Sequence, residues 1–395
     1  MAPALARRLP LSVQLIGVDG GATEVKVHEV EVVERGGETE LIAGARSSRR
    51  TYERVQGFAT PRARGLRSAA GLGEITPPER EQAFVWIESA ARSILDVAKP
   101  RAAVQVLVGI AMPGAKSADG RGIDFAFNGP RVPEFVSQLE DRLANEGVVL
   151  AAPIGRLLSD GWCCGMGEEW AEGGLFRGID DAYYVGGGTG VAEALKLAGR
   201  VVPLDELEPW FRKAWQLFDE LGEDVEQLLS VRGINARCGC DDARTPASAA
   251  RAFPEQRARH DEHVQTVLGE SARALARLVL LRVIVLHNRF RHDVTVRATG
   301  LGRVVVGQRL AQLLADPRTH EHFDSVVRSE LCEGLARLRG DGEFWASTER
   351  IAAELAHPLV ESLREARWLS LSPLRAAPAI GAAAAALIEW SRAHG

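Results

Sequence analysis

The stretch Ser12-Val-Gln-Leu-Ile-Gly-Val-Asp19-Gly-Gly-Ala-Thr23-Glu-Val-Lys26-Val-His-Glu-Val-Glu-Val-Val33 decides the fold of the chain. Strand-forming residues lie on both sides of a glycine pair, and the valines after it alternate at first with polar residues. This pattern predicts a β-hairpin. Gly20 and Gly21 would allow the positive backbone angles that a tight connection can need.

The turn of this hairpin has the composition of a polyphosphate site. Small residues, including Ala22, let backbone N–H groups approach phosphate oxygens, and the Thr23 hydroxyl adds a donor. Asp19 can hold a hydrated Mg²⁺, and Lys26 can offset negative charge. Two alternatives stay open. The turn could be an ordinary hairpin turn without a ligand, and Lys26 could lie on the strand surface away from phosphate. No Gly-x4-Gly-Lys-Ser/Thr run is present here, which excludes a P-loop at this turn.

A second copy of the same design lies further along the chain. Asp181 to Val185 is strand-like, the run Gly186-Gly-Gly-Thr189-Gly190 forms the loop, and Val191 to Leu197 continues as a strand. Two such units predict two similar domains that face one ligand. The arrangement resembles the actin-like ATPase superfamily, which includes sugar kinases, heat-shock ATPases and actin.

Length and composition predict a cytoplasmic protein with two domains. The chain has 395 residues, of which 46% are hydrophobic and 26% charged, as in globular proteins with substantial cores. A net charge of −5 gives no general attraction to nucleic acid or to an anionic membrane. Five cysteines, an odd number, and a first segment without a signal-peptide pattern favour a reducing compartment.

The order of the remaining segments predicts the α/β class. Thr76 has the position and spacing of a helix cap, and the helix that follows precedes a buried strand at Val104 to Ile110. The basic stretch from Arg46 to Gly73 is expected to be a mobile connection. Further helices are expected over Pro209–Leu229, Val264–Leu286, Arg303–Leu314 and 378–395, and a further strand over Asp293–Gly302.

Several motifs together resemble the ROK family of repressors, open reading frames and kinases, especially its glucokinase-like sugar kinases. The motifs are Asp19-Gly-Gly-Ala-Thr23, Ala111-Met-Pro-Gly114, Phe127-Asn128-Gly129, Ser159-Asp160-Gly, Gly187-Gly188-Thr189-Gly190, Thr299-Gly300-Leu-Gly302 and Ala379-Ile-Gly381. The resemblance implies an actin-like ATPase (ribonuclease H-like) fold with the active site in the interdomain cleft. Residues 1–127, joined by the terminal helix, would form the small domain and residues 128–377 the large one.

The resemblance also implies a role for each motif. ATP and Mg²⁺ would be the cofactors, a sugar the partner, Asp19 the metal-side carboxylate and Asp160 the general base. The alternative for Asp160 is a helix N-cap. Nucleotide contacts would come from Gly20, Gly21, Ala22, Thr23, Lys26, Gly187, Gly188, Thr189, Gly190, Gly300, Gly302 and Gly381. Sugar contacts would come from Asn128, Gly129, Ser159, Asp160 and Glu193, although Glu193 is equally consistent with a surface strand position.

The chain departs from the family pattern at three places. Ser159 stands where the family has asparagine, the Glu-x-Gly-His sugar motif has no match after Gly190, and of the zinc motif only Cys238-Gly-Cys240 is present. These departures leave the sugar undetermined. They also leave open a sugar-binding or regulatory relative without turnover, and an ATPase of the BadF or N-acetylglucosamine kinase type. A homodimer is a further expectation that the sequence does not decide.

Overall fold

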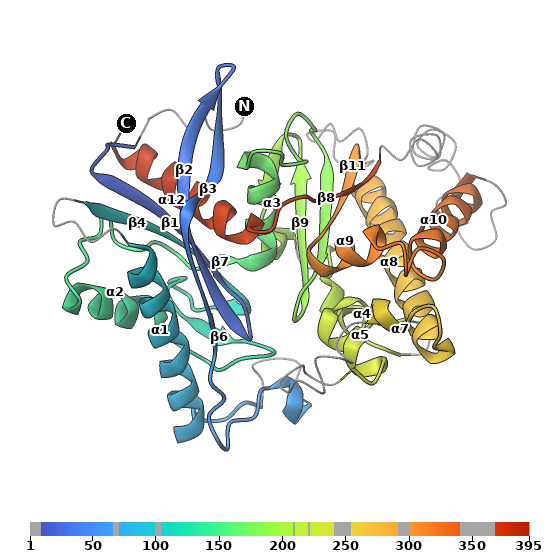
Figure 1. Cartoon of the computed structure of the whole chain (residues 1–395), viewed down its shortest axis with the longest axis horizontal. Helices are drawn as coiled ribbons and strands as arrows, with labels where there is room; N and C mark the ends of the chain where they lie inside the picture. Colours follow the sequence, from blue (N-terminus) through green and yellow to red (C-terminus); the bar gives the residue numbers. More distant parts are fainter. Residues whose placement is uncertain are drawn as a thin grey trace. The chain divides into compact units, whose positions relative to one another are not determined.

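The computed structural model of the chain describes residues 9–65, 71–98, 104–207, 210–219, 222–240, 254–290, 301–339 and 368–394. It divides into two compact units, the first formed by Met1–Gly174 with Leu374–Gly395 and the second by Leu175–Pro373 (Figure 1). The first unit extends well beyond the boundary expected after Phe127, because residues 128–174 complete its sheet and helical layers. The C-terminal helix also belongs to this unit.

The first unit is built on a five-stranded sheet. Its strands are β1 (Val13–Gly20), β2 (Glu24–Arg35), β3 (Glu38–Thr51), β4 (Gln105–Met112) and β7 (Leu158–Ser159). The order is β3-β2-β1-β4-β7. Strands β1 to β3 pair antiparallel, and β4 and β7 extend the sheet parallel to β1. The hairpin predicted from the opening stretch is therefore β1–β2.

Strand β3 takes in part of the basic stretch that was expected to be a mobile connection. Arg49 donates to Glu24 on the neighbouring strand at 2.6 Å, and Arg50 donates to Asp96 on the first long helix at 2.7 Å. The expectation is wrong for residues 46–51, because pairing with β2 and these ion pairs hold the arginines in an extended strand.

Helices cover both faces of this sheet (Figure 1). Helices α1 (Pro77–Val97) and α2 (Phe135–Asn145) share a hydrophobic cluster with Ile16 and Val18 of β1. Helices α3 (Asp160–Trp170) and α12 (Ala377–His394) pack against each other, and α12 lies on β1 and β4. Because side chains alternate along a strand, Gly17 faces α12 while its neighbours face α1. A short hairpin, β5 (Ala115–Lys116) and β6 (Ile123–Phe125), precedes α2, and a 3₁₀ turn spans Arg62–Arg64.

Replacing Gly109 with Ala is expected to destabilise the first unit by about 1–3 kcal/mol, since the added methyl group would overlap the Ala382 carbonyl of α12. The matched substitution Gly269→Ala should instead stabilise the chain by about 0.5–1 kcal/mol. Gly269 lies inside a long helix, and the nearest atom to an added methyl is 3.8 Å away. Denaturant unfolding of both variants tests the pair, and equal effects of one sign would contradict the packing.

The second unit repeats the strand order of the first. Its strands are β8 (Ala182–Gly187), β9 (Val191–Leu197), β10 (Arg200–Val202), β11 (Arg303–Gly307) and β12 (Leu369–Leu371). The order β10-β9-β8-β11-β12 has the same directions, with two antiparallel pairs followed by two parallel ones. The prediction of two similar domains, each opening on a strand–glycine loop–strand unit, is confirmed.

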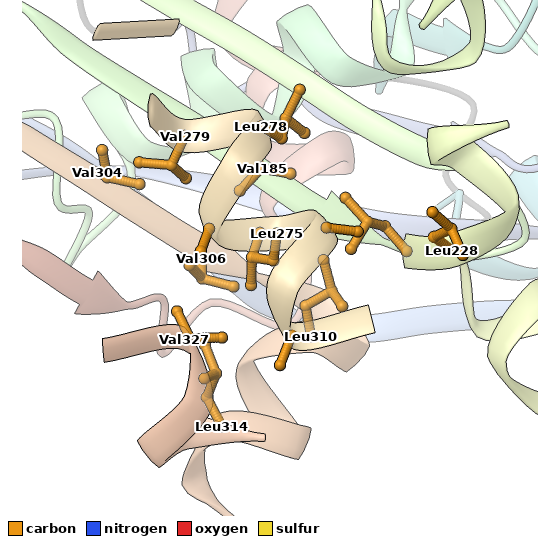
Figure 2. Close-up of a cluster of buried hydrophobic side chains, with 14 of the residues drawn as sticks. Val185, Leu228, Leu275, Leu278, Val279, Val304, Val306, Leu310, Leu314 and Val327 are labelled. Atoms are coloured by element: carbon orange, nitrogen blue, oxygen red, sulfur yellow. The ribbon is translucent and has the colours of Figure 1, made fainter. Parts of the chain in front are cut away.

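The second unit has one large hydrophobic core (Figure 2). Val304 of β11 lies beside Val279 of the long helix, and Val306 lies beside Leu275 of the same helix; Leu310, in the helix that follows β11, belongs to the same cluster. The helices are α4 (Val225–Leu229), α5 (Val231–Arg237), α7 (Pro254–Arg257), α8 (Glu262–Phe290), α9 (Gln308–Ala315) and α10 (Asp324–Arg339), with 3₁₀ turns at Leu204–Leu207 and Ala214–Gln216. None of the helices in the described residues is both long and apolar enough to cross a bilayer.

Two expected helices of the second unit differ from the structure. The described residues of Pro209–Leu229 form turns, a 3₁₀ segment and the short α4. Asp224 caps α4 by accepting from the Glu226 N–H, so this helix begins only at Val225. Residues 303–307 form β11 and only residues 308–315 are helical, since Val304, Val305 and Val306 are all buried in the sheet. Of the strand expected over Asp293–Gly302, residues 293–300 lie outside the described residues.

Candidate functional site

The carboxyl ends of three parallel strands meet at one edge of the first sheet. Asp19 on β1 lies opposite Ala111 on β4, and Ala111 lies opposite Leu158 on β7. Asp160 comes two residues later along the chain, at the start of α3. The sheet therefore brings Asp19 and Asp160 to the same edge, although 140 positions separate them in the sequence.

Asp19 is a largely buried carboxylate within a row of charged groups. It pairs across the strands with Lys26, whose Nζ lies 3.6 Å from Asp19 Oδ2 and 3.0 Å from Glu24 Oε1. Burial raises the pKa of Asp19 to about 6, with Lys26 opposing the shift and the charge of Asp160 adding to it. The two carboxylates of this edge are thus close enough to repel each other.

Asp160 lies in the first turn of α3, where the sequence predicted a carboxylate at the end of a strand. Its Oδ1 accepts a hydrogen bond from the Gly161 N–H at 2.9 Å. The N-cap position itself belongs to Ser159, whose side chain makes no capping bond. The alternative role of Asp160 as the N-cap is therefore wrong. Its charge also reaches Cys163 one turn on, where burial first and Asp160 second raise the pKa of the thiol.

The glycines of the first turn serve close packing. The backbone reverses direction between Gly20 and Glu24, and neither Gly20 nor Gly21 has a positive φ. The expectation that they would supply positive angles is wrong. A Cβ at Gly20 would instead overlap the sulfur of Met112 at the end of β4. Because Gly20 has no side chain, the turn can lie directly against Met112 at the end of β4.

Gly129, which follows the candidate sugar ligand Asn128, packs against an aromatic pair in the first unit. A Cβ at Gly129 would overlap the ring of Trp86, which stacks on Tyr52 with ring centroids 5.0 Å apart. Burial and then the charge of Asp19 raise the pKa of Tyr52, which places its hydroxyl within the electrostatic reach of the carboxylate edge. Sequence reasoning missed both aromatic residues, because neither belongs to a recognisable motif.

The second glycine loop is closed by its own backbone. The Gly188 N–H donates to the Gly190 carbonyl at 2.8 Å, and the loop passes close to its neighbours at both ends. A Cβ at Gly187 would lie 2.6 Å from the Leu229 carbonyl, and one at Gly190 would lie 3.1 Å from the Glu226 carboxylate. Thr189 stands at the tip of this loop, between the ends of β8 and β9.

Glu193 belongs to the core of the second unit and is not a substrate ligand. One carboxylate oxygen accepts from the Tyr183 hydroxyl at 2.6 Å and from Arg282 Nη2 at 2.6 Å, and the other accepts from the Ala214 N–H at 2.6 Å. The side chain is 3% exposed, so this assignment is corrected. The alternative of a surface strand position is correct for the strand, since Glu193 belongs to β9, but its side chain is buried and not at the surface.

Two further nucleotide assignments are corrected, and a third stays a prediction. Gly381 is buried between helices, where a Cβ would overlap the Cys163 carbonyl of α3, so it serves helix packing. Gly302 donates its N–H to Asp181 at 2.8 Å, at the amino ends of β8 and β11 and thus at the sheet edge opposite the glycine loop. Gly300 lies outside the described residues.

A divalent cation at the edge that holds Asp19 would need oxygen ligands in addition to that carboxylate. In the part of the chain that the structure describes, no three His, Cys, Asp or Glu side chains gather into a metal-binding group. Asp19 nevertheless fits a hard divalent cation, since its raised pKa reflects burial and repulsion from Asp160, both of which a cation would relieve. Mg²⁺ commonly binds through one or two carboxylates together with water and phosphate oxygens.

No protein-family model and no curated protein matches this sequence. Solved structures do. A ROK family glucokinase from Streptomyces griseus in complex with glucose and AMPPNP is 15% identical, with 94% of this chain and 98% of that chain covered at a TM-score of 0.51. The glucokinase from Parabacteroides distasonis is 14% identical over 96% and 98%, also at 0.51. The glucokinase from Balamuthia mandrillaris in complex with glucose is 14% identical over 94% and 93%, at 0.50. At these identities the likeness shows the fold.

Proposed function

We propose that this chain, which has the actin-like ATPase fold of the ROK sugar kinases, is an ATP-dependent kinase of a hexose or amino sugar. The observation that supports this function most strongly is the pair Asp19 and Asp160 at the shared carboxyl edge of parallel strands, beside a glycine turn. Two of the structural neighbours contain glucose, and one also contains an ATP analogue.

Asp160 acts as the general base of the proposed reaction. It accepts the proton of the attacking sugar hydroxyl, which the Asn128 amide helps to position. Backbone N–H groups and the Thr23 hydroxyl bind phosphate oxygens in the first unit, and the loop around Thr189 does so in the second. Lys26, already paired with Asp19, adds positive charge beside the phosphates.

Asp19 would hold hydrated Mg²⁺ in this reaction. When bound, the cation offsets the negative charge that develops on the transferred phosphoryl group. The contribution of the chain is to keep Asp19 beside Lys26 and Asp160 in a largely buried position.

The function is tested by incubating the protein with ATP, Mg²⁺ and a panel of neutral hexoses and amino sugars. We expect sugar-dependent ADP release with at least one member of the panel. Mass spectrometry of the product should show a phosphorylated sugar. ADP release at the same rate with and without sugar, or none at all, would contradict a sugar kinase.

Activity is expected to depend on pH through Asp19. Its pKa of about 6 means that the carboxyl is protonated below that pH, so Mg²⁺ binding and kcat/KM should rise as the pH increases through about 6. A higher Mg²⁺ concentration should move the midpoint to lower pH, because the cation competes with the proton. A profile whose midpoint does not respond to Mg²⁺ would contradict the assignment of Asp19.

The raised pKa of Asp19 also affects folding stability in the metal-free protein. It stabilises the folded state at pH values below the pKa of Asp19 in the unfolded chain, and this stabilisation is lost as the pH rises through about 6.

A sugar-binding protein without turnover is the second candidate, because the Glu-x-Gly-His motif is missing after Gly190. Titration calorimetry separates the two candidates. Heat from sugar binding, without any ADP release in the assay with the sugar panel, would select the second candidate.

A further inference from the structure

Among the described residues, Ala198 and Gln308 are the non-glycine residues with a positive φ, at 47° and 54°. Both fall in the left-handed region, which residues with a Cβ rarely adopt. Ala198 lies in the tight turn between β9 and β10, beside Gly199. Gln308 follows the last residue of β11 and begins α9. Glutamine carries a Cβ and a long side chain, so a positive φ at this position costs energy that an ordinary connection would avoid.

Gln308 lies directly against the second glycine loop. Its backbone forms a bridge with Gly187, next to the paired residues Gly307 and Gly186. Its side-chain oxygen is 3.1 Å from the place that a Cβ on Gly188 would occupy. The carboxamide of Gln308 therefore lies at the loop that is proposed to bind phosphate.

The positive φ gives the side chain this direction. Because φ fixes the direction of the Cα–Cβ bond, a residue in the usual helical region would aim its side chain elsewhere. The neighbours hold the strained angle in place, since Arg309 pairs with Glu255 and Leu310 is fully buried against the core. The surrounding structure thus retains a conformation that an isolated turn would relax.

We propose that Gln308 is a further nucleotide-binding residue, whose carboxamide NH₂ donates hydrogen bonds to phosphate oxygens held by the loop 187–190. A carboxamide supplies two N–H donors, and phosphate oxygens accept such bonds. The carboxamide carbon lies 3.9 Å from the same Cβ position on Gly188, so the whole amide group is beside the loop. This inference rests on the proposed ATP-dependent function.

Three variants separate nucleotide contact from backbone strain. Gln308→Glu keeps the size of the side chain and the strained angle, but it adds a carboxylate to a loop that already lies near Glu226. Gln308→Gly removes both the carboxamide and the strain. Ala198→Gly relieves the same kind of strain in a turn between β9 and β10 and is the matched control.

The measurements are binding of a non-hydrolysable ATP analogue by calorimetry, ADP release with a sugar, and melting temperature, all on the full chain. We expect Gln308→Glu to weaken analogue binding by about a hundredfold through charge repulsion. Gln308→Gly should weaken it by about tenfold. Both glycine variants should melt about 2–4 °C higher than the parent protein. Ala198→Gly should bind the analogue normally.

The outcomes distinguish this inference from the function on which it rests. If the parent protein binds the analogue and releases ADP while both Gln308 variants bind it equally well, Gln308 is not a nucleotide contact and the kinase assignment stands. If the parent protein neither binds the analogue nor turns over ATP, the function and the inference both fail. Weakened binding in Ala198→Gly as well would assign the effect to general strain and overturn the specific role of Gln308.

Discussion

Replacing Asp160 with Asn is expected to lower kcat for sugar phosphorylation by about 10²–10⁴-fold, the range that general-base catalysis supplies. The amide has nearly the same shape as the carboxylate but cannot take the proton of the sugar hydroxyl. Its oxygen can still accept the bond from the Gly161 N–H, so α3 should keep its first turn. Steady-state kinetics with saturating ATP and sugar measure the effect.

Two controls make this result specific. Affinity for a non-hydrolysable ATP analogue should change little, because the proton acceptor contributes mainly in the transition state. Asp141→Asn, at an exposed position on α2, should keep the full kcat. Normal turnover in Asp160→Asn would remove Asp160 as the base and leave the fold untouched.

Replacing Arg282 with Met is expected to destabilise the second unit by about 3–5 kcal/mol. Arg282 and Glu193 are 1% and 3% exposed, and the guanidinium also stacks on Phe211 with 4.1 Å to the ring centroid. Without Arg282, the Glu193 carboxylate loses its buried cation and keeps its desolvation cost. Chemical denaturation followed by circular dichroism measures the loss, with separate transitions expected where the units unfold independently.

The double variant Arg282→Met with Glu193→Leu tests the cause. Removing both charges leaves no isolated ion in the core, so it should recover much of the stability that the single variant loses. A double variant that is less stable than the Arg282→Met protein would contradict this account. Glu193→Gln provides a further check. If Glu193 bound the sugar, the substitution would change the KM for the sugar and leave stability unchanged. The core position predicts a loss of stability with an unchanged KM.

The sequence was sufficient for features that depend on local pattern. Alternating valines around a glycine pair predicted the β1–β2 hairpin, and small residues after a strand-like run placed Asp160 at a strand end. The α8 helix was predicted from its helical spacing, to within a few residues at each end. Each of these depends on residues that are neighbours in the chain.

The sequence was insufficient where a distant partner decides the outcome. Glu193 looked able to reach a substrate because its partner Arg282 lies 89 positions away, and no short-range pattern joins them. The arginines at positions 46–50 suggested a loop by composition, but β2 and α1 supply carboxylates that fix them in a strand. The nucleotide assignment of Gly302 was wrong because this residue lies immediately before the start of β11, where its N–H bonds to Asp181. The chain turns at the loop-side edge of the sheet only at Gly307 and Gln308.

Helix α12 makes the first unit depend on residues that are synthesised after the second unit. Residues 377–394 cover one face of the sheet that begins at Val13, and Gly17 and Gly109 leave the space for their close approach. During translation α12 cannot cover that face until residues 175–373 have been synthesised. The second unit can thus form its core before the first unit, which is completed only when α12 packs on its sheet.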